Sequence, residues 1–446
     1  MTRHVVRRLP VQTGPAAWNA ILGPVAQRGT LTGAQTADVV IVGAGFAGLS
    51  AARRLRQLQP TARIVVLEAG RIAEGSAGRN SGFMIDLPHD LTSDDYAGAG
   101  DDRGMIALNR TAISFASDAV EDYQISRDYF DRAGKVNGAV GEAAQAHNRS
   151  YARHLETLGE PCEVLDAQAM HALTGSHYYR SGLYSPGTVM LQPAGYIRGL
   201  ARGLERDGIT ICEGSAVTTL ERAGPDWRVA TDQGQVTAAH VILTVNGHLE
   251  SFGFARGRLM QLFLYAVMTP ELGPDALAQL GGAARWGVTP SDPMGTTMRR
   301  IDSGQGGNRI VTRTCATLLP GMRATSGHVV RASRIMQRKF DARFPSLAGM
   351  RMEYAWAGHL CLSLNGVSVT GKLDDGLYSA CVQNGLGTAR GTLTGMAAAE
   401  LVSGASSPIT RFVQNEPAPK RLPPRPFREI GANTVLRWRE WRARQE

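Results

Sequence analysis

Three glycines near the amino end of the chain and an acidic residue further on have the spacing of a dinucleotide-binding site. Gly43, Gly45 and Gly48 follow the pattern G-x-G-x-x-G in the stretch VVIVGAGFAG. The first glycine permits a tight turn, the second lets a pyrophosphate approach the backbone, and the third allows a helix to pack closely on a sheet. Glu68 follows Gly48 by 20 residues, where a carboxylate accepts hydrogen bonds from ribose hydroxyls and repels a 2′-phosphate. This spacing predicts binding of an adenine dinucleotide.

Such a turn must lie between a strand and a helix, and the flanking sequence predicts both. Ala37–Val42 is an apolar, β-branched run typical of a buried strand. Gly45–Gln59 carries apolar residues at helical spacing, and Ile64–Glu68 is a second short strand. Together they form a βαβ unit of about 30 residues. The alternative, a glycine turn without a ligand, is disfavoured because the glycines would cost conformational entropy with no gain in packing.

The residues after this unit resemble a known family. Residues 68–82 read EAGRIAEGSAGRNSG, which is similar to the FAD-dependent D-amino-acid-oxidase superfamily. The resemblance is greatest to its bacterial amine-oxidising branch of gamma-glutamylputrescine oxidoreductases, glycine oxidases and iminodiacetate oxidases. It implies FAD as the cofactor, with the loop Ser76–Gly82 against the flavin and its ribityl phosphate.

Later segments extend the resemblance over nearly the whole chain. Leu191-Gln192-Pro193 resembles the return into the FAD domain, and Val217 occupies the position whose backbone contacts adenine. The strand end LTVNG and the later segments Trp356–Gly358 and Gly385–Thr388 also match, the last two as the loop over the flavin pyrimidine ring. The cofactor-binding residues expected from the turn and the resemblance are Gly43, Ala44, Gly45, Phe46, Ala47, Gly48, Glu68, Ala69, Ser76, Ala77, Arg79, Asn80, Ser81, Gly82, Val217, Asn246, Gly247, Gly358, Gly385, Leu386, Gly387 and Thr388.

Two departures limit what the resemblance implies. The family's last glycine loop usually reads G-H-G, and here it reads Gly387-Thr388-Ala389, so no histidine role carries over. Residues 293–314 match only loosely: Arg299 or Arg300 corresponds to the arginine of the family's Y-Y-R, with Met298 in place of an aromatic residue. The substrate is therefore the least transferable part of the resemblance.

The chemistry implied is oxidation of a C–N bond by hydride transfer to flavin N5, after which the imine product hydrolyses. The protein must hold the C–H bond near N5, keep the amine neutral and exclude water, so a dedicated base is not obligatory. A substrate carboxylate is best clamped by a planar guanidinium. The expected catalytic residues are Arg299, Arg300, His359 and Tyr265, with Arg79, Arg256, Arg258, Arg313 and Gln261 as further candidates. For each of them a purely structural role is the alternative.

The cysteines and histidines indicate neither a disulfide framework nor a metal site. Five widely spaced cysteines without a Cys-x-x-Cys pair fit a reducing compartment. Cys361 falls close to the position at which sarcosine-oxidase-like relatives link a cysteine to the flavin. We expect a buried, space-filling thiol there and non-covalent FAD. The ten histidines lack metal-ligand spacing, so no metal is expected.

Length and composition place the chain among globular proteins of two or three domains. It has 446 residues, 43% of them apolar and 20% charged, which excludes wholesale disorder. No run approaches 18 apolar residues and no apolar leader precedes the first strand, so we expect a cytoplasmic protein. The expected divisions are an arm (1–36), FAD-binding parts (37–115, 189–250, 346–410), substrate-binding parts (116–188, 251–345) and a basic extension (411–446).

Positive charge is concentrated in that extension. The net charge is +9, and residues 411–446 hold nine basic and four acidic residues, a net +5. Arg437, Arg439, Arg442 and Arg444 alternate with Trp438 and Trp441 on a predicted short helix. We expect a solvated face whose tryptophans dock on the body, with arm and extension both peripheral. A nucleic-acid or anionic-membrane patch is the alternative.

The fold class expected is α/β (α+β overall), with a discontinuous Rossmann-type FAD-binding domain and an antiparallel-sheet substrate domain. The expected function is an FAD-dependent oxidase or dehydrogenase of a small amine or amino acid, secondary or N-substituted and carrying a carboxylate. Oxygen or an electron carrier would accept the electrons. No nucleic-acid partner and at most peripheral membrane contact are expected. Two alternatives stay open: an FAD-containing RNA-modifying or RNA-binding protein that uses the basic tail, and an NAD-dependent dehydrogenase.

Overall fold

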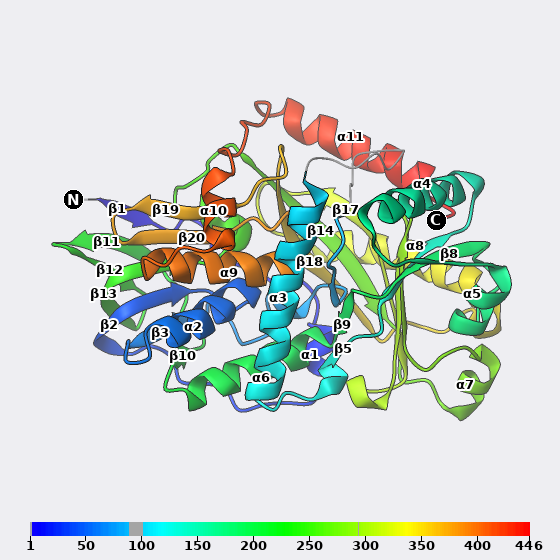
Figure 1. Cartoon of the computed structure of the whole chain (residues 1–446), viewed down its shortest axis with the longest axis horizontal. Coiled ribbons are helices and arrows are strands. Elements are labelled where there is room, and N and C mark those ends of the chain that lie inside the picture. Colours follow the sequence, from blue (N-terminus) through cyan, green and yellow to red (C-terminus); the bar gives the residue numbers. More distant parts are fainter. Residues whose placement is uncertain (1, 89–100, 293) are drawn as a thin grey trace.

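Two large sheets lie side by side along the long axis of the computed structural model (Figure 1). The structure describes residues 2–88, 101–292 and 294–446. The parts of the expected divisions that cover 89–100 and 293 lie outside the described residues.

The first sheet has nine strands and contains the predicted βαβ unit. β2 (Gly33–Val42) pairs in parallel with β3 (Ile64–Leu67) on one side and β13 (Gly234–Leu243) on the other. Val39 and Ile41 pack on one face of the sheet, whereas Val40 and Val42 pack on the opposite face. Burial on both faces explains the continuous apolar run of this strand. The other strands are β1 (Arg3–Val5), β10 (Thr210–Cys212), β11 (Thr219–Ala223), β12 (Asp226–Ala230), β19 (Val369–Asp374) and β20 (Leu377–Cys381).

The second sheet has eight strands, and all but one of its pairings are antiparallel. Its strands, in order across the sheet, are β18 (Tyr354–Ser363), β14 (Leu259–Met268), β17 (Arg309–Leu318), β16 (Thr297–Ile301), β15 (Trp286–Pro290), β6 (Lys135–Ala139), β8 (Ser181–Ser185) and β7 (Glu163–Leu165). A small third sheet joins β4 (Phe83–Met84), β9 (Val189–Leu191) and β5 (Phe130–Asp131). The predicted fold class, a parallel Rossmann-type unit beside an antiparallel sheet, is confirmed.

Helices cover the sheets, and two of them bring their amino ends to one edge of the first sheet. α2 (Phe46–Leu58) follows β2, and α9 (Ala389–Val402) follows β20. They pack so closely that a Cβ at Gly395 would lie 2.2 Å from the Ala47 carbonyl oxygen. The remaining helices are α1 (Ala17–Ala20), α3 (Asp102–Asp122), α4 (Glu142–Leu158), α5 (Ala167–Thr174), α6 (Pro193–Arg206), α7 (Pro274–Leu280), α8 (Ser326–Arg343), α10 (Pro408–Asn415) and α11 (Phe427–Arg442).

The amino-terminal segment is not peripheral, contrary to the expectation. β1 pairs with β11 at the edge of the first sheet. Trp18 and Leu31 are fully buried, and the Trp18 indole donates a hydrogen bond to the Asn80 carbonyl oxygen. Apolar and polar residues are mixed in this stretch and interrupted by glycines and prolines, so hydrophobic patterning did not identify it as part of the body.

The expected domain boundaries remain a prediction, but one strand differs from them. β18 falls within the part assigned to the FAD domain, 346–410, yet it pairs with β14 of the antiparallel sheet. The last return of the chain to the first sheet therefore comes after β18, later than the expected boundary at residue 346.

Candidate functional site

A cavity of about 330 Å³ lies where the carboxyl ends of the parallel strands face the antiparallel sheet. This edge is where ligands bind in open parallel sheets. Predicted cofactor residues that line the cavity are Gly43, Ala44, Gly45, Phe46, Ala47, Glu68, Ala69, Ser76, Ala77, Asn80, Ser81, Val217, Asn246, Gly385, Gly387 and Thr388. Those that do not line it are Gly48, Arg79, Gly82, Gly247, Gly358 and Leu386.

The three glycines of the first turn have different surroundings, and the differences fit a bound dinucleotide. Gly43 has a φ of +106°, and a Cβ there would lie 2.9 Å from the Thr244 carbonyl oxygen. A Cβ at Gly48 would lie 1.9 Å from the Gly43 carbonyl oxygen, so this glycine serves the helix packing. At Gly45 the nearest atom is the Ala77 Cβ at 3.7 Å. Nothing in the protein requires glycine at position 45, which is the position that faces the pyrophosphate in this motif.

Glu68 lies at the end of β3 with its carboxylate directed at the turn. Its Oε2 accepts a hydrogen bond from the Ala44 amide at 2.9 Å, and its Oε1 accepts one from the Gly70 amide at 3.0 Å. Burial raises the pKa of this carboxyl, and the two amide donors act against that rise. A carboxylate has about four lone-pair sites, so capacity remains for ribose hydroxyl donors.

The loop Ser76–Gly82 forms the cavity wall next to the antiparallel sheet. The Ser76 hydroxyl donates to the His359 carbonyl oxygen at 2.9 Å, and the Asn80 side-chain amide donates to the Ala77 carbonyl oxygen at 2.6 Å. Arg79 is buried and donates to four carbonyl oxygens, those of Thr13, Gly14, Glu74 and Ala357. Burial lowers the pKa of Arg79 to about 10. Arg79 therefore positions the loop and does not reach into the cavity.

Residues 382–388 form the opposite wall and contain several unusual backbone conformations. Val382 and Asn384 have φ values of +65° and +49°, and Gly385 has +88°. A β-branched residue with positive φ is strained, and such strain is concentrated at functional sites. The Thr388 hydroxyl donates to the Phe83 carbonyl oxygen at 2.7 Å and fixes the start of α9 beside the cavity. The unpaired amides of a helix's first turn favour a partial negative charge nearby.

His359 lines the cavity and is held as one neutral tautomer. Its Nε2 lies 2.9 Å from the Gln261 Oε1. The Gln261 Nε2 donates to the Gly247 carbonyl oxygen and to the Glu250 Oε2, so its Oε1 must accept from the His359 N–H. Burial lowers the pKa of His359 to about 3 and that of the neighbouring His248 to about 4. Both rings are uncharged at neutral pH.

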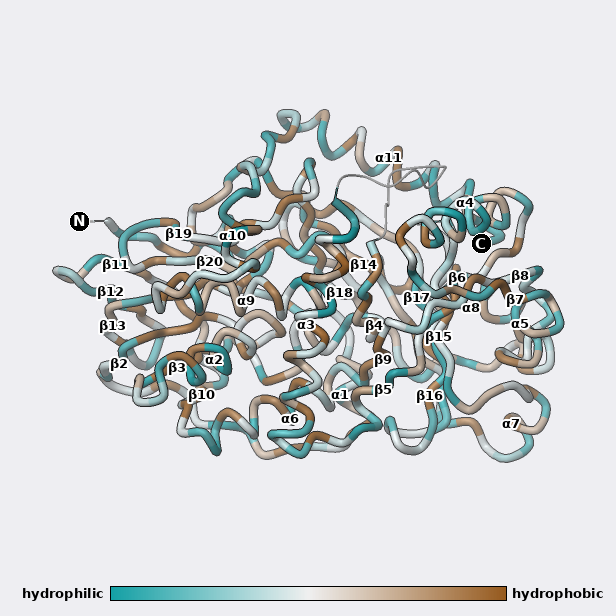
Figure 2. The backbone as a smooth tube through the Cα atoms, viewed as in Figure 1, coloured by the Kyte–Doolittle hydropathy of each residue, from teal (hydrophilic) through white to brown (hydrophobic). Residues whose placement is uncertain are grey.

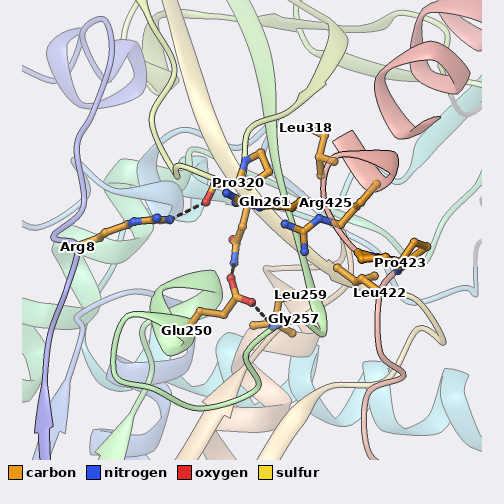
Figure 3. Close-up of a pocket in the computed structure, with 12 residues that line it drawn as sticks. Arg8, Glu250, Gly257, Leu259, Gln261, Leu318, Pro320, Leu422, Pro423 and Arg425 are labelled. Carbon is orange, nitrogen blue, oxygen red and sulfur yellow. Dashed lines mark hydrogen bonds between the residues drawn. The ribbon is translucent and has the colours of Figure 1, made fainter. Parts of the chain in front are cut away.

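The hydrogen bonds that run from His359 through Gln261 end at Glu250, which borders a second cavity of about 360 Å³ (Figure 3). Glu250 lies between Gln261 and the Gly257 amide, which donates to the Glu250 Oε1 at 3.0 Å. On the other side Arg8 donates to the Pro320 carbonyl oxygen at 2.8 Å. Arg425, from the carboxyl-terminal extension, also lines this space. The amino-terminal segment and the carboxyl-terminal extension therefore meet beside the residues that support His359.

The structure does not bring the other predicted catalytic residues to the cavity. Arg299 is fully buried and donates to the carbonyl oxygens of Gly82 and Leu191, and burial lowers its pKa to about 9. Arg300 points to the opposite face of β16 and donates to the Gly281 carbonyl oxygen. Tyr265 packs in an apolar cluster under α8, where burial raises the pKa of its hydroxyl. Arg299 holds the Ser76–Gly82 loop in place, as Arg79 does.

Arg313 differs from the other arginine candidates. In the described part of the chain it has no hydrogen-bonding or ion-pair partner, although it is only partly exposed. It lies opposite Ala266 and Thr297 in the sheet, and Ala266 lies opposite Trp356. Directly opposed residues point to the same face. The Trp356 indole donates to the Arg79 carbonyl oxygen at 3.0 Å, so this face is the one that contacts the Ser76–Gly82 loop.

Neither a covalent flavin link nor a metal site is supported. Cys361 is fully buried beneath Gly247, does not line the cavity, and has a pKa raised well above 9 by burial. Across the described residues, no group of three or more His, Cys, Asp or Glu side chains could hold a metal ion. No helix within the described ranges is long and apolar enough to span a bilayer.

Sequence reasoning missed part of the cavity wall. Residues 6–12 of the amino-terminal segment line it, anchored by a hydrogen bond from the Val6 amide to the Thr218 carbonyl oxygen at 2.9 Å. Phe83, Thr244, Phe263 and Met322 also line it. The aromatic residue next to the glycine loop, Phe83, was the one detectable signal, since the others stand in ordinary strand or loop contexts.

Comparisons with known proteins agree with this geometry. The model of the family described as FAD dependent oxidoreductase (DAO) matches residues 38–401. The chain is similar to gamma-glutamylputrescine oxidoreductase of Escherichia coli (strain K12), with 27% identity over 86% of this chain and 87% of that protein. It is also similar to the sarcosine oxidase beta subunit of Rhizobium meliloti (strain 1021), with 26% identity over 76% and 78% of the two chains.

The fold has solved counterparts as well. The structure of glycine oxidase from Geobacillus kaustophilus superposes with a TM-score of 0.67 at 18% identity, covering 84% of this chain and 96% of that one. Because the family match covers most of the chain, and the glycine turn, Glu68 and the Ser76–Gly82 loop border one cavity, the chain belongs to the DAO family of FAD-dependent oxidoreductases.

Proposed function

We propose that this FAD-dependent oxidoreductase oxidises the C–N bond of a small amine or amino acid that carries a carboxylate. The observation that carries the proposal is the unpartnered guanidinium of Arg313 on the sheet face that contacts the flavin loop. The relatives named for gamma-glutamylputrescine, sarcosine and glycine support an amine nitrogen as the site of oxidation.

Arg313 is the best carboxylate anchor among the arginines. Arg79, Arg258, Arg299 and Arg300 donate to carbonyl oxygens of the protein. Arg256 is exposed to solvent at the surface. A partly buried guanidinium without a partner is costly unless a ligand supplies one, and a carboxylate matches its planar fork.

The cavity offers the surroundings that hydride removal from a neutral amine requires. Bound FAD supplies the two-electron acceptor for the hydride. Phe263 and Met322 line the space with apolar surface, and the ring of Phe263 stacks on that of His359 at 5.1 Å. Because His359 and His248 are uncharged, neither ring attracts or repels a substrate amine according to its charge. The residues thus orient a substrate and exclude water, and no side chain acts as an obligatory base.

The amino end of α9, at Thr388, contributes stabilisation of negative charge. The amides of a first helical turn stabilise negative charge, and Gly387 and Thr388 line the cavity. In the family resemblance this loop lies over the flavin pyrimidine ring, where charge accumulates on reduction. This contribution uses backbone only, so replacement of the family's histidine by Thr388 leaves it intact.

An anaerobic reduction screen tests the proposal. The yellow holoenzyme is mixed without oxygen with sarcosine and other N-substituted glycines, glycine, γ-glutamylated amines, and matched amines that lack a carboxylate. We expect bleaching of the flavin absorbance with a carboxylate-bearing amine and at least tenfold slower bleaching with its decarboxylated analogue. Bleaching by the analogue at the same rate would refute the anchor, and bleaching by NADH alone would refute the amine donor. Admitting oxygen or a soluble quinone afterwards identifies the electron acceptor.

A further inference from the structure

The carboxyl-terminal helix α11 has its apolar side turned to solvent. Phe427, Ile430, Val435, Trp438 and Trp441 are 73%, 65%, 50%, 51% and 61% exposed. Successive members of this set are three, five, three and three residues apart, which at about 100° per residue keeps all of them on one side of the helix. Among the described residues, every exposed large aromatic side chain of the molecule lies on this helix. Figure 2 shows hydrophobic residues recurring along α11 at the upper edge of the molecule.

The opposite side of α11 attaches to the body through polar contacts. The Asn433 side chain accepts from the Leu318 amide at 3.0 Å and donates to the Leu318 carbonyl oxygen at 3.2 Å. Arg437 donates to the Thr317 hydroxyl at 3.0 Å, and Glu440 pairs with Arg331 at 2.8 Å. No side chain of α11 is buried. The prediction that its tryptophans dock on the body is therefore wrong, because the helix is polar inside and apolar outside.

Cationic groups border the apolar stripe. The guanidinium of Arg442 lies 5.4 Å from the Trp438 ring centre, and that of Arg444 lies 5.0 Å from the Trp441 ring centre. The acidic residues of the helix, Glu429 and Glu440, are engaged with arginines of this chain. Residues 411–446 have nine basic and four acidic side chains, a net +5. The surface that fits this stripe is therefore apolar at its centre and negatively charged at its border.

We propose that α11 is an interfacial helix that binds the holoenzyme to the surface of an anionic lipid bilayer. Trp and Phe on one side and Arg at the border are the composition of helices that lie in the headgroup region, where indole rings and snorkelling guanidinium groups are both stabilised. A second copy of the chain fits less well, because residues 411–446 carry a net charge of +5 and two such segments repel each other when their α11 helices pair. Apolar insertion and charge attraction act together, as stable peripheral binding requires.

The test is flotation of the holoenzyme with lipid vesicles. Vesicles of phosphatidylcholine alone are compared with vesicles that contain 30% phosphatidylglycerol, at low and high salt. We expect binding to the anionic vesicles that weakens with salt. The double variant Trp438→Ser/Trp441→Ser should lose at least nine-tenths of it, and Arg442→Gln/Arg444→Gln should lower partitioning about 30-fold. Val164→Ser, an exposed apolar residue elsewhere that is 66% accessible, is the matched control and should bind normally.

Tryptophan fluorescence provides a second readout in the same samples. The chain has six tryptophans, and Trp18, Trp227, Trp286 and Trp356 are buried. A blue shift with anionic vesicles and quenching by brominated lipid must therefore come from α11. Unchanged flavin absorbance and amine-dependent bleaching show that each variant is folded. Three results would overturn the proposal: no binding to either vesicle, a concentration-dependent dimer that the tryptophan variant abolishes, or RNA binding that it abolishes while vesicle binding is absent.

Discussion

The two walls of the cavity are built by different parts of the polypeptide. On the parallel-sheet side the groups presented are mostly backbone: the turn at Gly43–Gly48, the first turn of α9 and the loop after Val382. On the antiparallel-sheet side they are side chains of single strand positions, Phe263 and His359, and Arg313 lies on the sheet face that contacts the Ser76–Gly82 loop. Backbone sites need glycine at fixed spacing and can be recognised in a sequence. Side-chain sites depend on the face of a strand, which shifts with register and with bulges such as that at Leu264/Tyr265.

The largest effects on folding and on FAD binding should come from two substitutions in the glycine turn. Gly48 serves helix packing, whereas Gly45 faces the expected pyrophosphate. In Gly48→Ala the new Cβ would lie 1.9 Å from the Gly43 carbonyl oxygen, so α2 cannot seat on the sheet. We expect no soluble flavoprotein. Gly45→Ala has 3.7 Å to its nearest protein neighbour and should fold with an unchanged circular dichroism spectrum. Its FAD dissociation constant should rise about 10- to 100-fold, because the methyl group displaces a charged hydrogen-bond acceptor from the backbone.

Titration of the apo-protein with FAD, followed by flavin fluorescence, measures this difference. Gly273→Ala is a useful control, since no atom lies within 4 Å of a Cβ at that position and it does not line the cavity. If Gly45→Ala retained FAD as the wild type does, the pyrophosphate would have to lie elsewhere.

In the antiparallel sheet, Arg313→Met should lower kcat/KM for a carboxylate-bearing amine about 100-fold, mostly through KM. The reason is the loss of a charge-assisted, bidentate contact that no other described arginine can replace. Steady-state kinetics of Arg256→Met, an exposed arginine, supply the control and should match the wild type. Equal losses with a decarboxylated substrate analogue would mean that Arg313 supports the fold rather than the carboxylate.

These contrasts explain what could be predicted from the sequence. The βαβ unit, Glu68 and the Ser76–Gly82 loop follow from local patterns. Arg299 was selected for its residue type and its place in the resemblance, but it donates to the carbonyl oxygens of Gly82 and Leu191, which lie more than 100 positions away in the chain. The amino-terminal segment was missed for a related reason. Its place in the cavity wall depends on hydrogen bonds to Thr218 and Pro320, which no local pattern reveals.

Removing residues 2–12 should have a smaller effect on FAD retention. It tests the part that the amino-terminal segment plays in the cavity wall. This segment lines the cavity and is held by the pairing of β1 with β11 and by hydrogen bonds of Val6 and Arg8. Thr13 and Gly14, which accept from Arg79, remain in the truncated chain. We expect FAD to dissociate about tenfold faster while kcat of the FAD-saturated enzyme stays within twofold. Stopped-flow release of flavin into apo-flavodoxin measures the rate, and a rate equal to that of the full chain would limit the segment to a structural role.

The smallest expected effect is that of His359→Gln on the pH dependence of kcat/KM. It shows whether the ionising group belongs to the substrate or to the protein. Burial lowers the pKa of His359 to about 3 and that of His248 to about 4. A lowered pKa means that each ring gains its proton only below that value, so neither changes charge between pH 5 and 9. The rise of kcat/KM with pH should then follow the substrate amine, which must be neutral to lose a hydride. Two substrates whose amine pKa values differ by about one unit should therefore shift the profile by about one unit, and His359→Gln should leave its shape unchanged. A low-pH limb fixed near 6.5 for every substrate and absent from His359→Gln would instead assign that ionisation to the histidine, and would require His359 to be far more solvated than its stacking on Phe263 allows.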